Sequence, residues 1–360
     1  MAEAPSEEAV PPSTPSGSIN LPKSTERWIV AGVSISSAVL IIISLSSGVT
    51  IEQLEGPGYL FVGLAVLAVL AKLMVQVLKF RVIAGGLTAG SRTDFRGVVT
   101  ARIGSEFVAL TTPSFIGGEF VRAAWLARKG VEPGRALWIG FLEICIDVYV
   151  GSAISLVAAW VAFSRGATAV ASLIVIVILP ILAGYTVFLL ILARKGVRLP
   201  SSFLWLLSGL IGKSRAELLL ARLQGWADQF SAAAKATGRQ SMPTIVLAVC
   251  IALVQALISG LILWLLLAPV RAIDPFSSVL SVFAVQALAS VPVTVGGSGL
   301  SELGLQWYLT TVYGFPSWAT VVLWRLVSYQ LVEVISGASF VWLLTRGMKR
   351  RQGSSGGRMG

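Results

Sequence analysis

The stretch Pro113-Ser114-Phe115-Ile116-Gly117-Gly118-Glu119 interrupts one apolar run of the chain, and Pro292-Val293-Thr294-Val295-Gly296-Gly297-Ser298 interrupts another. Both stretches read Pro, three residues, Gly-Gly, and we name them the first break and the second break. Proline removes a helical hydrogen bond and glycine disfavours helix, so each stretch predicts an interruption in an otherwise helical segment. The two prolines lie 179 residues apart (292 − 113) in a chain of 360. Matched breaks in the two halves of a membrane protein indicate a binding site built from discontinuous helices.

Composition identifies the class of protein. The chain is 55% hydrophobic and 12% charged, with a mean hydropathy of +0.83, whereas soluble domains are about 25% charged. Apolar runs of about 20 residues, the length that crosses a bilayer, recur along the chain. We therefore expect an all-α polytopic membrane protein. In such a protein the net charge of +11 indicates cytoplasmic loops that contact anionic inner-leaflet lipid, and not a nucleic-acid partner.

The apolar runs predict six full spans and two broken segments. The spans are expected at about 28–47, 57–80, 136–164, 170–193, 243–267 and 317–344, and the broken segments at about 103–127 and 276–312. Residues 1–22 are polar and predict a disordered tail without a cleavable signal peptide. Residues 23–345 form one transmembrane domain with halves at about 28–164 and 167–345, and 346–360 form a basic flexible tail. Residues 214–237 predict an amphipathic helix, either on the cytoplasmic membrane surface or docked against the bundle.

The distribution of basic residues selects a topology. If each broken segment crossed the membrane, the basic stretches 81–102 and 128–135 would lie on opposite sides, against the positive-inside rule. If each broken segment enters and leaves on one side, the basic stretches 81–102, 128–135, 194–239 and 346–351 all lie inside, together with both termini. This arrangement gives two re-entrant helical hairpins in an inverted-topology repeat, as in many transporters of the cell membrane.

The breaks carry candidate binding chemistry. At each break, backbone N–H groups at the start of a half-helix, together with the helix dipole, favour an anion such as a phosphate. This reasoning assigns substrate binding to Pro113, Gly117, Gly118, Glu119, Pro292, Gly296, Gly297 and Glu302. The structural alternative is that proline makes a turn while the glycines permit tight packing.

Ionisable residues inside spans are costly and mark pathways or ion pairs. Glu143 and Asp147 share one helix face, and Arg325, Tyr329 and Glu333 share another. We expect Arg325 to bind substrate in a midplane cavity with Glu143 or Asp147 as its counter-charge, or to form a structural ion pair. Gating or pairing roles fall to Glu106, Arg122, Glu143, Asp147, Tyr329 and Glu333, although Arg122 is also placed to snorkel to the cytoplasmic face.

Other chemistry is excluded or left open by composition. The chain has no histidine, which removes histidine-based acid–base catalysis and most transition-metal sites. No cofactor, metal or P-loop is predicted. The expected partners are membrane lipids, while a homodimer and a separate lipid-modifying enzyme remain open.

The motifs carry a family resemblance. The runs Pro113-x-x-x-Gly117-Gly118-Glu119-x-x-Arg122 and Pro292-x-x-x-Gly296-Gly297-x-Gly299-x-x-Glu302, with Arg325 in the last span, resemble the lysylphosphatidylglycerol synthase transmembrane family over about residues 25–345. This is the flippase-like region of the multiple peptide resistance factor. The resemblance implies translocation of a polar-headed lipid, either an aminoacylated phospholipid or a polyprenyl-linked sugar. The sequence shows no soluble aminoacyl-transfer domain after the last span, so lipid synthesis is not expected.

Four functions compete. A lipid translocator predicts a lateral opening to lipid, whereas an ion-coupled transporter of a small solute predicts a cavity closed off from it. A lipid-modifying enzyme is disfavoured because the chain contains no histidine and no clear acidic metal motif. A non-catalytic scaffold leaves the intramembrane charges Glu143, Glu302 and Arg325 unexplained.

Overall fold

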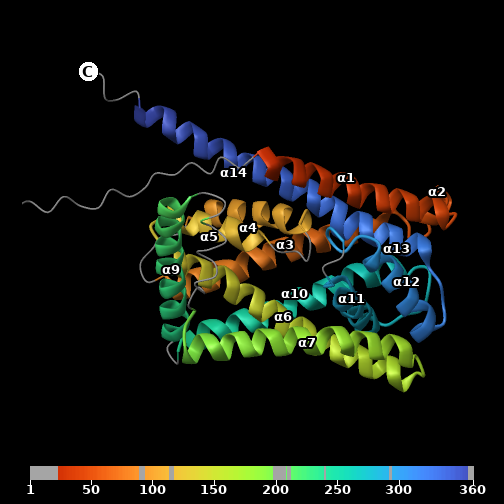
Figure 1. Cartoon of the computed structure of the whole chain (residues 1–360). Coiled ribbons are helices and arrows are strands. Elements are labelled where there is room, and N and C mark those ends of the chain that lie inside the picture. Colours follow the sequence, from red (N-terminus) through yellow and green to blue (C-terminus); the bar gives the residue numbers. More distant parts are fainter. Residues whose placement is uncertain are drawn as a thin grey trace, which may run out of the picture.

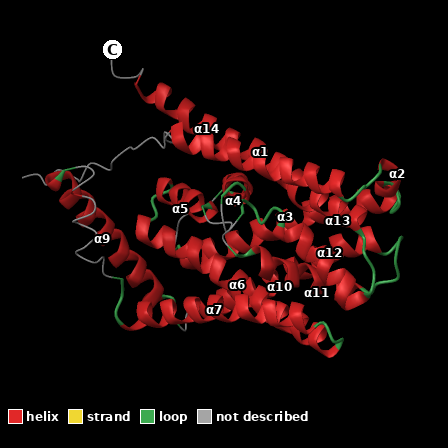
Figure 2. Ribbon diagram, turned by 45° about the vertical axis from the view of Figure 1, so that its right-hand side comes forward, coloured by secondary structure: helices red, strands yellow, loops and turns green. Residues whose placement is uncertain are grey.

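The protein is a bundle of helices (Figures 1 and 2). The computed structural model describes residues 23–88, 94–112, 117–197, 208, 212–238, 241–291 and 294–355. Within these ranges the regular elements are helices, with no strands. The expected all-α class is therefore confirmed for the described residues. The predicted tail at 1–22 lies outside them.

Five helical segments have the length and apolar composition to cross a membrane. They are α3 (Tyr59–Leu87), α6 (Pro133–Ser164), α7 (Thr168–Arg194), α10 (Met242–Leu267) and the segment Trp318–Thr345. The last segment comprises α13 (Trp318–Arg325), the π-helix η2 (Leu326–Gln330) and the first part of α14 (Leu331–Ser355). The chain is thus a multi-pass membrane protein. The sixth expected span corresponds to α1 (Lys23–Ser46), whose apolar part Val30–Ser46 is shorter than the other five, and the short helix α2 (Ile51–Leu54) follows it.

Each broken segment forms two short helices. The first contains α4 (Phe95–Leu110) and α5 (Gly118–Arg128), and the second contains α11 (Pro275–Ala289) and α12 (Leu300–Tyr313). The helices end at the predicted breaks, although Pro113 and Pro292 themselves lie outside the described residues. In Figure 1, α4 and α5 lie toward the end of the bundle that carries α9, whereas α11 and α12 lie toward the opposite end.

The outer ends of each short-helix pair lie close together. Lys129, just after α5, donates to Asp94, just before α4, over 2.8 Å. Tyr313 at the end of α12 donates to the carbonyl of Ser277 in the first turn of α11 over 3.3 Å. Both pairs are therefore hairpins that are closed at their base.

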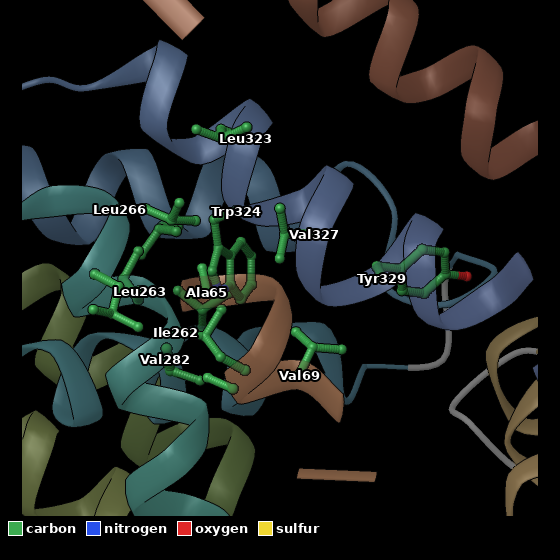
Figure 3. Packing of buried hydrophobic residues seen from close by; sticks show 14 of the residues in the cluster. Ala65, Val69, Ile262, Leu263, Leu266, Val282, Leu323, Trp324, Val327 and Tyr329 are labelled. Carbon is green, nitrogen blue, oxygen red and sulfur yellow. The ribbon is translucent and has the colours of Figure 1, made fainter. Parts of the chain in front are cut away.

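The core is assembled from helices of both halves. Helix α3 packs along α10, α4 along α14, and α11 along α6. Figure 3 shows Trp324 of α13 among Ala65 and Val69 of α3 and Ile262 of α10. Side chains on α7 such as Ile176 and Leu190 are largely exposed, which is the expected pattern for a helix that faces lipid at the edge of a bundle.

The predicted amphipathic helix is present as α9 (Lys213–Ala236). It docks on the bundle: Phe230 packs edge-on against Trp138 of α6, and Gln229 accepts a hydrogen bond from the Gly134 N–H over 3.0 Å. Leu218 and Trp226 remain exposed. Docking, one of the two expected alternatives, is therefore what the structure contains.

Aspartates cap the first helix of both hairpins. Asp94 accepts from the Gly97 N–H over 2.9 Å, and Asp274 accepts from the Ser277 N–H over 2.9 Å. A carboxylate at a helix N-cap satisfies a backbone donor that has no intrahelical partner. The two caps thus fix where each hairpin begins.

Asp274 makes stability depend on pH. The pKa of its carboxyl lies below its ordinary value because the Ser277 hydroxyl and backbone N–H donate to the charged form. A lowered folded-state pKa gives stability that is present above the unfolded pKa of about 3.9 and is lost as pH falls through the folded value. Acidification from pH 7 to about pH 3 should therefore lower the thermal midpoint of the wild type more than that of Asp274→Asn, because asparagine caps without titrating. Thermal unfolding in detergent, with the exposed Asp228→Asn as control, measures this, and parallel pH curves for wild type and Asp274→Asn would contradict it.

Candidate functional site

Six ionisable side chains from four helices form a buried network beside the first break. They are Lys79 of α3, Arg102 and Glu106 of α4, Arg122 of α5, and Glu143 and Asp147 of α6, and we name them the first ion cluster. Three formal positive charges face three formal negative charges. A balanced set is the form in which charges are tolerated at membrane depth, since an unpaired charge there is costly.

Glu143 is the centre of the first ion cluster. Its side chain is 1% exposed, and its two oxygens lie 3.0 Å from Arg102 Nε and 3.1 Å from Arg122 Nε. Arg102 also donates to Glu106 over 2.5 Å. One carboxylate thus joins both helices of the first hairpin to α6.

The first ion cluster reaches into the second half of the chain. Lys79 donates to Asp147 over 2.5 Å and to the side-chain oxygen of Gln255, on α10, over 2.9 Å. The Asp147 side chain is 36% exposed, in contrast to the fully buried Lys79. Asp147 is therefore the most exposed member of the network.

A second network lies at the second break. Arg325 pairs with Glu302 over 2.9 Å, and both side chains are almost fully buried. The same guanidinium donates to the Gly296 carbonyl over 2.8 Å and to the Ser298 hydroxyl over 3.0 Å. These four residues, together with Tyr329, make up what we name the second ion cluster. Arg325 thereby ties the last span to the second hairpin.

Tyr329 connects the two breaks. Its ring lies over the Arg325 guanidinium, 3.7 Å from ring centroid to Cζ. Its hydroxyl donates over 2.6 Å to the carbonyl of Leu110, the last residue of α4. A Cβ added to Gly296 would lie 1.8 Å from the same hydroxyl. The end of the first half-helix and the backbone of the second break therefore meet at one side chain.

Each break holds an acidic side chain against its own backbone. Glu119 accepts from the Gly117 N–H over 3.0 Å, and Glu302 accepts from the Gly299 N–H over 2.7 Å. Helix N-termini favour anions, and at both breaks a carboxylate of the chain occupies that place. Gly118 lies in the first turn of α5, and Gly296 contributes its carbonyl to Arg325.

Several pairings differ from the sequence prediction. Glu143 and Asp147 were expected to balance Arg325, but they pair with Arg102, Arg122 and Lys79, while Glu302 balances Arg325. Helical spacing places residues on a face but does not show which helix that face meets. The alternative in which Arg122 snorkels is also wrong, because Arg122 is 4% exposed and lies against Glu143.

The sequence prediction missed Lys79 and Arg102 as site residues. Arg102 was assigned to the basic stretch 81–102 and Lys79, at the end of the expected span 57–80, to no site, but α3 continues to Leu87, and Arg102 lies two turns inside α4. The signal that identifies Arg102 is Glu106 four residues later on the same helix face. Among the described side chains, no group of three or more acidic residues or cysteines is placed to hold a metal ion.

Gly296 is a position where an added side chain should be strongly destabilising. Its φ of +55° is strained for other residues, and Tyr329 fills the space that a Cβ would need. Gly296→Ala should lower the free energy of unfolding by about 2–4 kcal/mol through backbone strain and overpacking. Gly63→Ala is the control, since it meets open space. Equal thermal midpoints for the two variants would contradict the packing described.

Comparison with known proteins agrees with these features. The sequence model of the lysylphosphatidylglycerol synthase TM region matches residues 29–337. No curated protein matches the chain. The matched range includes both hairpins, both ion clusters, four of the five long apolar segments and the fifth as far as Gly337. The chain therefore belongs to the lysylphosphatidylglycerol synthase transmembrane region family.

Proposed function

We propose that this chain translocates a polar-headed, phosphate-bearing lipid between the leaflets of the cell membrane. The observation that carries the proposal is the meeting of the two breaks at Tyr329, which joins Leu110 to the second ion cluster. Discontinuous helices that meet near the midplane form the substrate sites of many transporters. Membership of a family associated with lipid aminoacylation and translocation supports a lipid as the substrate.

The hairpins are proposed to be re-entrant from opposite sides. Helices of 16 and 11 residues in the first hairpin, and of 15 and 14 in the second, measure about 17–24 Å at about 1.5 Å per residue, less than the bilayer core of about 30 Å. Closure of both hairpins at their bases supports entry and exit on one side. The matching order of long and short helices in the two halves supports an inverted repeat.

The headgroup is proposed to exchange with a carboxylate of the chain. Glu302 holds both the N-terminus of α12 and Arg325, which are two positions that a phosphate also prefers. A phosphate that displaces Glu302 would interact with both the Arg325 guanidinium and the Gly299 N–H. Glu302 would then pair with a cationic group of the same headgroup. The acyl or prenyl tail stays in lipid, so no large cavity is required.

Leaflet translocation in proteoliposomes tests this function. Fluorescent phospholipids, an aminoacylated phospholipid and a polyprenyl-phosphate analogue are compared with empty vesicles and with uptake of small soluble anions. Glu302→Gln should slow the phosphate-bearing lipids at least tenfold, because Arg325 is then left without a counter-charge and retains the headgroup. The exposed Arg194→Ala should have no effect.

The assay separates the two leading functions. The lipid that moves fastest identifies the headgroup class, either an aminoacylated phospholipid or a polyprenyl-phosphate-linked sugar. Folded protein that moves no lipid faster than empty vesicles would overturn the proposal, and uptake of a small solute by that protein would establish the ion-coupled transporter instead.

A further inference from the structure

Glu333 is a buried carboxyl that forms no ion pair with the side chains that the structure describes. It lies on α14, is 4% exposed, and its Oε1 has no hydrogen-bond partner in the described part of the chain. The buried carboxylates Glu143 and Glu302, by contrast, each lie within 3.1 Å of an arginine. The amide of Gln330, one turn earlier, also has no partner for its buried oxygen and nitrogen among the described residues.

The charged groups around Glu333 are committed elsewhere. Arg325, the nearest cation, is held by Glu302 and the Gly296 carbonyl. The Tyr329 hydroxyl donates to Leu110.

Among the described residues of the helices packed against this part of the chain, no cation forms an ion pair with Glu333. Helix α4 presents Phe107 to α14 at Gly337, and Lys72 on α3 lies near the acidic side chains Glu106 and Asp147 of the first ion cluster. Helix α1 contributes Ser36, which is 1% exposed and whose hydroxyl lies close to both Glu333 and Tyr329. An ionised carboxylate in such a place is strongly disfavoured, whereas its neutral form is tolerated.

We propose that Glu333 is a proton-binding site and that its proton is exchanged during the transport cycle. In the conformation described here the carboxyl carries the proton. Loss of the proton to water leaves a carboxylate that attracts Arg325 away from Glu302. That exchange frees Glu302 and the N-terminus of α12, the same groups that the headgroup is proposed to engage.

The backbone between these residues is suited to such a shift. Residues Leu326–Gln330, between Arg325 and Glu333, form a π-helix in which the Leu331 N–H bonds to the Leu326 carbonyl. Such π-bulges occur frequently at functional sites. Helix α1 is coupled to the same point: a Cβ on its Gly32 would lie 2.7 Å from the Thr111 carbonyl and 3.2 Å from Val295. A change at Ser36 and Glu333 is therefore transmitted to a helix that lies against both breaks.

Infrared difference spectroscopy on the protein in lipid, titrated with pH, tests the proton site without any transport. The wild type should show the carbonyl band of a protonated carboxylic acid near neutral pH. Glu333→Gln should lose the band, whereas Glu217→Gln on the exposed face of α9 should retain it. Absence of the band in the wild type, or its persistence in Glu333→Gln, would overturn the proposal.

A second variant covers the case in which Glu333→Gln does not fold. Ser36→Ala removes the neighbouring hydroxyl, so the pH midpoint of the band should shift. An unshifted midpoint would show that the titrating group is not Glu333.

The coupling step rests on the proposed lipid translocation and has its own measurement. With one proton exchanged per lipid, a gradient of about two pH units supports up to about a 100-fold ratio of lipid between leaflets. In Glu333→Gln the ratio of lipid between the leaflets should fall to about one. A wild-type ratio that does not depend on the pH gradient would overturn the coupling of lipid transport to protons. If no lipid moves but the band is lost in Glu333→Gln, the lipid proposal fails and the proton site stands.

Discussion

Glu143→Leu should lower the free energy of unfolding by about 3–5 kcal/mol, because it leaves buried cations without their partner. Among the described residues, Arg122 loses its one ion-pair partner, and Arg102 retains only Glu106. The same change separates α4 and α5 from α6, so the first hairpin should loosen. Thermal unfolding of the purified protein, or resistance to denaturant, measures the loss.

A double variant separates the charge effect from simple packing damage. Arg122→Met combined with Glu143→Leu removes both members of one pair, and replacement of a whole buried pair is close to neutral in other proteins. The double variant should therefore be more stable than Glu143→Leu alone. Additive losses would contradict a network centred on Glu143, since residues in one network are expected to be strongly non-additive.

Arg325→Lys should reduce lipid translocation by about 10–100-fold while the charge is preserved. Lysine cannot contact Glu302, the Gly296 carbonyl and Ser298 in one planar arrangement, nor stack in the same way over Tyr329. Loss of one hydrogen bond to a charged group corresponds to about 1.5–3 kcal/mol, which is a factor of about 10–100. Initial rates of leaflet translocation in proteoliposomes give the comparison.

Arg165→Lys is the matched control for this substitution. Arg165 also donates to a carbonyl and lies over a tyrosine ring, Tyr313, but far from either break in the chain. It should retain the wild-type rate. An Arg325→Lys variant that transports normally would show that the planar guanidinium has no role in binding the headgroup.

The positions of most helices follow from the sequence. The apolar runs predict α6, α7 and α10 to within about three residues, since long uninterrupted spans leave little choice of boundary. The glycines that follow each proline predict where α5 and α12 begin, and Asp94 predicts the start of α4. The family resemblance carried by the two breaks is confirmed.

The choice of partners inside the bundle does not follow from the sequence. Lys79 and Arg102 resemble loop residues because hydropathy treats every lysine and arginine as polar, whereas a carboxylate on another helix allows both to be buried. Arg325 and Glu302 come together because the second hairpin folds back beside the last span. That proximity depends on tertiary structure, which periodicity along one helix does not report. That Glu333 has no ion-pair partner among the described residues can be recognised only in the folded structure, where Arg325 pairs with Glu302 instead.

The side of the membrane that each hairpin faces is the most direct test of this account. In a background with Cys145 and Cys250 replaced, Lys129→Cys reports the base of the first hairpin and Gly314→Cys reports the base of the second, and both positions are exposed. A membrane-impermeant maleimide should label the two cysteines from opposite sides, as required for two re-entrant hairpins in an inverted repeat. Labelling of both cysteines from the same side would mean that each broken segment crosses the membrane, and it would contradict the proposed site between the breaks.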